Sequence, residues 1–207
     1  MSALPGRDGL IEGARDALPP YVGIDLGDVR LVRSDTQAQE ALAALMAADV
    51  IGFDTESKPT FAKGEVSTGP HLVQLATDER AFLFQTATPA GIALALSVLA
   101  PVLAADGILK VGFGLGDDVR RLKSKFGIEL LGVLDLSTAL RRRGEKNPLG
   151  AKSAVERFLG QRLQKSKRIT TTNWALPRLS DKQLQYAADD AHAALRIYRH
   201  WKAHPPA

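Results

Sequence analysis

The sequence predicts an α/β domain built on a mixed sheet of five or six strands flanked by helices, and three observations support this fold class. In the first half, the apolar runs 72–76 and 81–84 are separated by the polar residues 77–80, a pattern typical of an antiparallel hairpin. In the second half, strand-like and helix-like segments alternate, as they do in βαβ units. The chain has 207 residues, 45% of them hydrophobic, which suffices for one domain with a buried core.

The elements can be predicted in chain order. Residues 1–27 are expected to form a flexible N-terminal arm, residues 28–203 a single domain and residues 204–207 a tail. Ser34 and Gln37 have the spacing of a capping box at the start of a helix, and Ser180 and Gln183 repeat it before the last helix. The predicted strands are 30–32, 50–53, 72–76, 81–84, 108–113 and 133–136. The predicted helices are 34–48, 89–104, 116–126, 150–159 and 180–201.

Composition excludes several classes of protein. The chain has no cysteine, which rules out disulfide scaffolds and thiolate zinc sites. The N-terminal residues lack the apolar segment of a signal peptide. The longest apolar stretch, 91–105, is too short to span a bilayer and contains Pro101. We therefore expect a soluble, cytoplasmic protein with no targeting segment and no membrane partner.

Charge is distributed unevenly along the chain. Residues 141–168 contain ten Lys and Arg against two acids, a net charge of +8, whereas the rest of the chain has 17 basic against 21 acidic residues and a net charge of −4. A basic segment beside an acidic site suits a polyanionic substrate that is brought to a metal centre. A solvated helix and loop rich in lysine would explain the same segment equally well.

Two carboxylates follow an apolar run in Ile-Gly-Phe-Asp-Thr-Glu. Asp54 and Glu56 are two residues apart on a predicted strand, so their side chains point to the same face. A pair of carboxylates on one face can supply the oxygen ligands that hard divalent cations need. Because Asp-x-Glu is also common at solvated strand ends, this motif alone is weak.

A second acidic motif lies on the last predicted helix. Tyr186 and Asp190 are four residues apart and share a helix face. Asp189 points about 100° away from Asp190, so only Asp190 can join a site with Tyr186. A half-buried tyrosine that anchors the helix is the alternative reading of Tyr186.

Asp117 and Asp118 open a predicted helix after three glycines. We interpret Asp117 as the N-cap and Asp118 as the candidate ligand, although spacing alone does not separate the two roles. The glycines do not match the dinucleotide-binding pattern Gly-x-Gly-x-x-Gly, and two aspartates at the helix start would repel a pyrophosphate. We therefore expect no nucleotide cofactor, and a nucleotide-dependent oxidoreductase is disfavoured.

Three segments together resemble the exonuclease motifs of the DEDD superfamily. They are Phe-Asp-Thr-Glu at 53–56, Lys-Val-Gly-Phe-Gly-Leu-Gly-Asp-Asp at 110–118 and Tyr-Ala-Ala-Asp-Asp-Ala at 186–191. The tyrosine four residues before the last aspartate is typical of the DEDDy branch, and the chain is similar to its ribonuclease D and Werner-type 3′–5′ exonuclease domains. The segments Leu-Val-Gln-Leu-Ala at 72–76 and Asn173-Trp174 match as well.

The resemblance implies an RNase H-like fold and a two-metal 3′–5′ exonuclease that hydrolyses phosphodiester bonds of DNA or RNA from the 3′ end and releases nucleoside 5′-monophosphates. It implies that two divalent cations, Mg²⁺ or Mn²⁺, are bound by Asp54, Glu56, Asp118 and Asp190. Tyr186 would orient the attacking water, because a phenol with a pKa of about 10 is a poor base at neutral pH. The alternative is a catalytically weak nucleic-acid-binding module of the same fold.

Basic residues near these motifs are candidates for contacts to the phosphates of DNA or RNA. We expect such contacts from Lys58, Arg141, Arg142, Arg143, Lys165, Lys167 and Arg168. Trp174 could stack on a base, but a packed core tryptophan fits its setting better.

Overall fold

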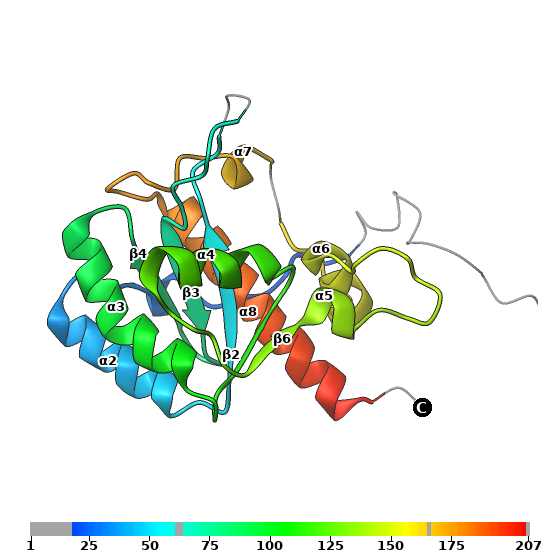
Figure 1. Ribbon diagram of the computed structural model, residues 1–207. Coiled ribbons are helices and arrows are strands. Elements are labelled where there is room, and N and C mark those ends of the chain that lie inside the picture. Colours follow the sequence, from blue (N-terminus) through cyan, green and yellow to red (C-terminus); the bar gives the residue numbers. More distant parts are fainter. Residues whose placement is uncertain (1–17, 61–63, 165–166, 206–207) are drawn as a thin grey trace, which may run out of the picture.

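A computed structural model describes residues 18–60, 64–164 and 167–205 (Figure 1). Six strands form one sheet in the order β1-β4-β3-β2-β5-β6. β2, β3 and β4 are antiparallel neighbours, whereas β1 runs parallel to β4, and β5 and β6 run parallel to β2. The predicted mixed sheet is therefore confirmed, with six strands. Their bounds are β1 Val29–Leu31, β2 Val50–Glu56, β3 Leu72–Ala76, β4 Ala81–Gln85, β5 Leu109–Gly112 and β6 Val133–Asp135.

The helices agree with most of the predicted segments. The helical elements are η1 Leu26–Asp28, α2 Asp35–Met46, α3 Pro89–Ala104, α4 Gly116–Phe126, α5 Leu136–Ala139, α6 Ala151–Ala154, η2 Val155–Leu159, α7 Lys167–Thr170 and α8 Asp181–Ala203. The predicted helix 150–159 is present as α6 followed by the π-helical turn η2. η1, α5 and α7 were not predicted, since three or four residues are too few to show a helical period.

Two apolar layers enclose the sheet. On one face, α2, α3 and α4 pack against alternate residues of the central strands, including Ile51, Phe53, Val73 and Leu75. On the other face, α8 covers the strands, and its Ala188 and Ala191 cluster with Ala76 and Ala81 (Figure 1). The side chains of β2 and β3 therefore alternate between the α2/α3/α4 face and the α8 face.

The capping box predicted at Ser180 is complete, whereas only half of the one predicted at Ser34 forms. At α8, the Ser180 side chain accepts from the backbone N–H of Gln183, and the Gln183 side chain accepts from the backbone N–H of Ser180. At α2, the Ser34 hydroxyl accepts from the N–H of Gln37, but the Gln37 side chain accepts from the backbone N–H of Arg33 instead of that of Ser34. These bonds satisfy amides that a helix start leaves without intrahelical partners, so both helix starts could be located from sequence.

Residues 18–27 differ from the predicted flexible arm. Tyr21 and Arg162 are joined by a backbone hydrogen bond of 2.9 Å, and the Tyr21 hydroxyl lies 3.0 Å from Nδ1 of His192 on α8. Gln185 and Arg196, also on α8, donate side-chain hydrogen bonds to the carbonyls of Ile24 and Val22. The segment is held by contacts to residues more than 130 positions away, which no local pattern shows. Residues 1–17 of the predicted arm lie outside the described residues.

Candidate active site

β2 places its two carboxylates on the α8 face of the sheet. Ile51 and Phe53 are buried in the core on the opposite face, so Asp54 and Glu56 point toward α8, as the two-residue period of a strand requires. Both side chains are half-buried at the C-terminal end of the strand.

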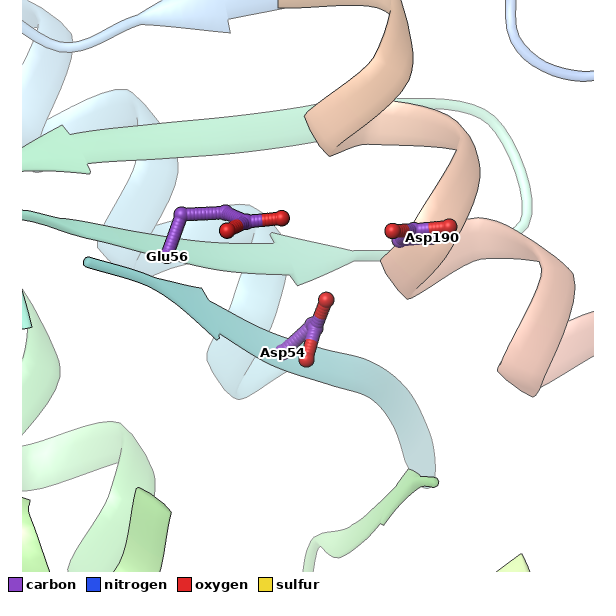
Figure 2. A group of neighbouring side chains, drawn as sticks. All are labelled: Asp54, Glu56 and Asp190. Carbon is purple, nitrogen blue, oxygen red and sulfur yellow. The ribbon is translucent and has the colours of Figure 1, made fainter. Parts of the chain in front are cut away.

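Asp190 approaches these carboxylates from α8. One carboxylate oxygen from each of Asp54, Glu56 and Asp190 lies within 4.8 Å of the others, and Figure 2 shows the three side chains converging from β2 and α8. Asp190 is buried, with 6% of its surface exposed. Three carboxylates at this separation repel one another, and a divalent cation bound by them would offset that repulsion. The donor set of hard oxygen atoms fits Mg²⁺ or Mn²⁺.

A glycine allows α8 to approach β2 closely enough for this convergence. A Cβ atom placed on Gly52 would lie 1.9 Å from the backbone oxygen of Ala191. No side chain can occupy that space, because real Cβ contacts are much longer. Gly52 precedes Asp54 by two residues and Ala191 follows Asp190, so this backbone contact sets the distance between the two carboxylates.

Tyr186 lies one helical turn before Asp190 and is buried, with 6% of its surface exposed. Its ring packs beside that of Trp174, with ring centroids 5.9 Å apart. The pKa of the Tyr186 hydroxyl is raised well above its usual value, first by burial and then by the negative charges of Asp190 and Glu56. The hydroxyl therefore faces the carboxylate cluster and remains protonated at any physiological pH.

Trp174 is fully buried in the cluster formed with Leu72, Leu83 and Tyr186. It is a core residue that supports the tyrosine, and stacking on a base would require exposed ring surface. The core reading of Trp174 is therefore the correct one.

Asp189, next to Asp190, points to a different environment. Its Oδ1 accepts a hydrogen bond of 2.9 Å from Nε2 of Gln185 and lies against Gly23. Burial raises the pKa of Asp189 to about 6. Asp189 and Asp190 point in different directions because successive residues of a helix are about 100° apart, as expected from the sequence.

Asp118 does not belong to the group of three converging carboxylates. It lies on the first turn of α4, where its Oδ1 accepts a hydrogen bond from the hydroxyl of Thr55. Burial raises the pKa of Asp118, whereas the bond from Thr55 and the charge of Arg121 oppose that rise. Because Thr55 points to the face of β2 opposite Asp54 and Glu56, the structure places Asp118 beside the cluster rather than within it.

The N-cap interpretation of Asp117 was wrong. Asp117 is exposed and forms a salt bridge of 2.6 Å with Arg120, and no side chain of α4 caps the helix. Instead, the carboxylate of Asp135 on β6 accepts from the backbone N–H groups of Gly114 and Leu115, each at 3.0 Å. Asp135 comes from a neighbouring parallel strand, so its role depends on sheet order and could not be derived from the local spacing.

The predicted nucleic-acid contacts occupy different places. Arg141, Arg142 and Arg143 are exposed on the loop between α5 and α6, which projects from the body of the domain in Figure 1. Lys58 lies two residues after Glu56, and its backbone N–H donates to Nδ1 of His71. Lys167 and Arg168 are in α7, whose last residue, Thr170, hydrogen-bonds through its side chain with Tyr186. Lys165 lies outside the described residues.

A basic cavity near β2 was not predicted. Its volume is about 480 Å³, and it lies between the loop after β2 and α4, where Arg121, Lys125, Thr68 and Ser124 contribute to its lining. Arg121 donates to the hydroxyl of Ser57, the residue after Glu56. Lys125 holds the loop by donating to the carbonyls of Thr68 and Pro70. The sequence shows no sign of this cavity, because Arg121 and Lys125 lie on a helix of mixed charge.

Comparison with known proteins identifies relatives along most of the chain. A family model described as 3′-5′ exonuclease matches residues 29–203. A 3′-5′ exonuclease of Arabidopsis thaliana is 32% identical over 158 residues, covering 76% of this chain and 54% of that protein. Exonuclease 3′-5′ domain-containing protein 2 of Mus musculus is 34% identical over 110 residues, covering 52% of this chain and 17% of that protein. The chain thus spans about half or less of the length of these two relatives.

Solved structures share the fold. The Aedes aegypti Nibbler EXO domain has a TM-score of 0.70 and 27% identity, covering 87% of this chain and 89% of that chain. Trypanosoma brucei RNase D in complex with RNA U12 has a TM-score of 0.71 and 25% identity, covering 83% of this chain and 61% of that chain. These similarities confirm the RNase H-like exonuclease fold. Across the described residues, no helix combines the length and apolar character needed to cross a membrane.

Proposed function

Because the chain belongs to the 3′–5′ exonuclease family, we propose that it hydrolyses phosphodiester bonds of DNA or RNA from the 3′ end and releases nucleoside 5′-monophosphates, in a reaction that depends on two divalent cations. The observation that carries this proposal is the convergence of Asp54, Glu56 and Asp190, with oxygens within 4.8 Å, beside the protonated hydroxyl of Tyr186.

Asp54, Glu56 and Asp190 would hold the cations, with Asp118 as the fourth carboxylate. When bound, two divalent cations activate water at neutral pH and stabilise charge on the leaving oxygen of an in-line displacement. The converging side chains are all carboxylates and offer only oxygen ligands, which agrees with the preference of Mg²⁺ and Mn²⁺ for oxygen.

Tyr186 would orient the attacking water rather than remove its proton. A general base must lose its own proton near the working pH, whereas burial and two neighbouring carboxylates keep this phenol protonated. Its hydroxyl forms side-chain hydrogen bonds with Asp190 and Thr170, and its ring packs beside Trp174, so these contacts hold the phenol oxygen beside the carboxylate cluster.

A basic cavity near the carboxylate cluster could hold the substrate strand. The cavity with Arg121 and Lys125 adjoins Ser57, and the short helix α7, which contains Lys167 and Arg168, ends at Thr170, whose side chain hydrogen-bonds with Tyr186. Arg121 and Lys125 would contact backbone phosphates in a manner independent of sequence. The likeness to an RNase D solved with RNA supports including RNA among the substrates.

One observation favours the alternative of a catalytically weak nucleic-acid-binding module. Asp118 is hydrogen-bonded to Thr55 and does not join the other three carboxylates, so the predicted set of four is not assembled.

Degradation of 5′-labelled DNA and RNA oligonucleotides with Mg²⁺ or Mn²⁺ distinguishes the two functions. The exonuclease should give a ladder that shortens from the 3′ end, and Asp54→Ala and Asp190→Ala should abolish it. Binding of the oligonucleotides by folded, metal-loaded protein without cleavage would instead establish the binding module.

A further inference from the structure

Gln74 on β3 is a buried amide without a hydrogen-bond partner. None of its surface is exposed, and neither Nε2 nor Oε1 has a hydrogen-bond partner among the residues that the structure describes. Buried side-chain amides are nearly always hydrogen-bonded, because leaving both ends without a partner costs the desolvation of each. An exception of this kind in a domain core requires an explanation.

The position of Gln74 supplies that explanation. In the antiparallel β2–β3 pair, Gln74 stands directly opposite Asp54. Side chains that face each other in this way lie on the same side of the sheet, with Cβ atoms about 4.5–5.5 Å apart. Its neighbours Val73 and Leu75 point to the α2/α3/α4 face. Gln74 therefore points to the α8 face, into the layer that contains the carboxylate cluster.

The surroundings of Gln74 would accommodate an apolar residue. On the same face of β3, Leu72 and Ala76 are fully buried against residues of α8, namely Tyr186, Ala187, Ala188 and Ala191. Leucine has nearly the volume of glutamine and no polar atoms to satisfy. Packing therefore gives no reason for an amide at this position, and the adjacent carboxylate does.

We propose that Gln74 is a positioning residue for the carboxylate cluster, acting through Asp54. The amide N–H groups of Gln74 can donate to a carboxylate oxygen of Asp54 when Asp54 is oriented to hold a cation, which would fix that orientation. The amide would then obtain its partner in the metal-loaded protein, and the metal-free protein carries the cost of the buried, unsatisfied group. This inference rests on the proposed metal-dependent function.

The test compares Gln74→Leu with the wild type by melting, Mn²⁺ titration and exonuclease assay. Because the substitution removes an unsatisfied amide, the metal-free Tm should rise by roughly 2–4 °C. At the same time, Mn²⁺ affinity, followed by the Mn²⁺-dependent rise in Tm, and the rate of nucleotide release should each fall roughly 10–100-fold. If Gln74 had a purely structural role, Gln74→Leu would instead lower the metal-free Tm.

Gln183 provides a matched control, since it is also buried but fully partnered by Ser180 and Thr172. Gln183→Leu should lower the metal-free Tm, which would show that the assay detects the loss of a satisfied amide.

Three results would overturn the inference. A Gln74→Leu protein with a lowered Tm, or with unchanged Mn²⁺ affinity and nucleotide release beside an active wild type, would exclude a positioning role. Absence of any Mn²⁺ response and of cleavage in the wild type would overturn the proposed function, and this inference with it.

Discussion

The backbone oxygen of Ala191 occupies the space where a side chain on Gly52 would begin, only 1.9 Å from an ideal Cβ position. This contact joins α8 to β2 one residue from Asp190 and two residues from Asp54. The carboxylate cluster therefore depends on a position that has no chemical function of its own.

Gly52→Ala should separate α8 from β2 and damage both stability and activity. The added methyl group must displace backbone rather than a flexible side chain, a form of overpacking that costs about 1–3 kcal/mol. We expect a lower Tm. We also expect slower nucleotide release at a temperature where the variant is fully folded, so that unfolding cannot account for the lost activity. Gly107→Ala, where a Cβ meets nothing within 4 Å, is the control. Wild-type activity in a folded Gly52→Ala protein would contradict this prediction.

The placement of Asp118 predicts that it contributes less to metal binding than Asp54. Since the three converging carboxylates form a group without it, Asp118→Asn should keep most of the Mn²⁺-dependent increase in Tm, whereas Asp54→Asn should lose it. Differential scanning fluorimetry across a Mn²⁺ series makes the comparison. An equal loss in the two variants would show that Asp118 leaves Thr55 and joins the cluster when metal binds.

Tyr186→Phe should slow nucleotide release about 10–100-fold while leaving the fold intact, because the ring still packs against Trp174. The pKa of Tyr186 is raised, so the phenol stays protonated up to pH 9 and its ionisation adds no basic limb to the pH–rate profile. The profiles of the two proteins between pH 6 and 9 should therefore have the same shape. A limb that is present in the wild type and absent in Tyr186→Phe would assign the tyrosine as a base.

Arg121→Gln should weaken oligonucleotide binding and reduce its salt dependence. If Arg121 contacts one backbone phosphate, the substitution should make the slope of the logarithm of the binding constant against the logarithm of the salt concentration shallower by about 0.7 for a single strand. Fluorescence anisotropy over a salt series, in Ca²⁺ to prevent cleavage, measures the slope. Arg120→Gln provides the comparison, since Arg120 is exposed and paired with Asp117 on the same helix. An identical slope in wild type and Arg121→Gln would exclude a phosphate contact at the cavity.

The ion pair between Asp49 and Arg199 predicts a pH-dependent contribution to stability. Arg199 hydrogen bonds lower the pKa of Asp49 to about 2, below the usual 3.8. Because the folded-state pKa lies below the unfolded one, the stabilisation is complete above about pH 4 and is lost as the pH falls through about 2. The pair is largely exposed, so Asp49→Asn should lower the free energy of unfolding by only about 0.5–1 kcal/mol at pH 7. Urea unfolding should show a smaller difference in the free energy of unfolding between wild type and Asp49→Asn at pH 2 than at pH 7. An equal difference at the two pH values would contradict a stabilising ion pair.

Local periods in the sequence determined a large part of the fold and of the site. The two-residue period of a strand places Asp54 and Glu56 on one face of β2, and the spacing of four places Tyr186 and Asp190 on one face of α8. The side-chain caps at Ser34 and Ser180 locate two helix starts, because each serine accepts from an amide only three residues along the chain. Each of these features depends on residues within one turn or one strand, so a single sequence suffices to predict it.

Tertiary structure decided which of these faces meet. Only strand register sets Gln74 opposite Asp54, and only sheet order brings Asp135 to the start of α4. The pairing of Asp118 with Thr55 and the packing of residues 18–27 on α8 likewise join positions at least 60 residues apart. Such contacts depend on the exclusion of water from a shared core and on close backbone approach at Gly52, and neither leaves a periodic pattern in the sequence.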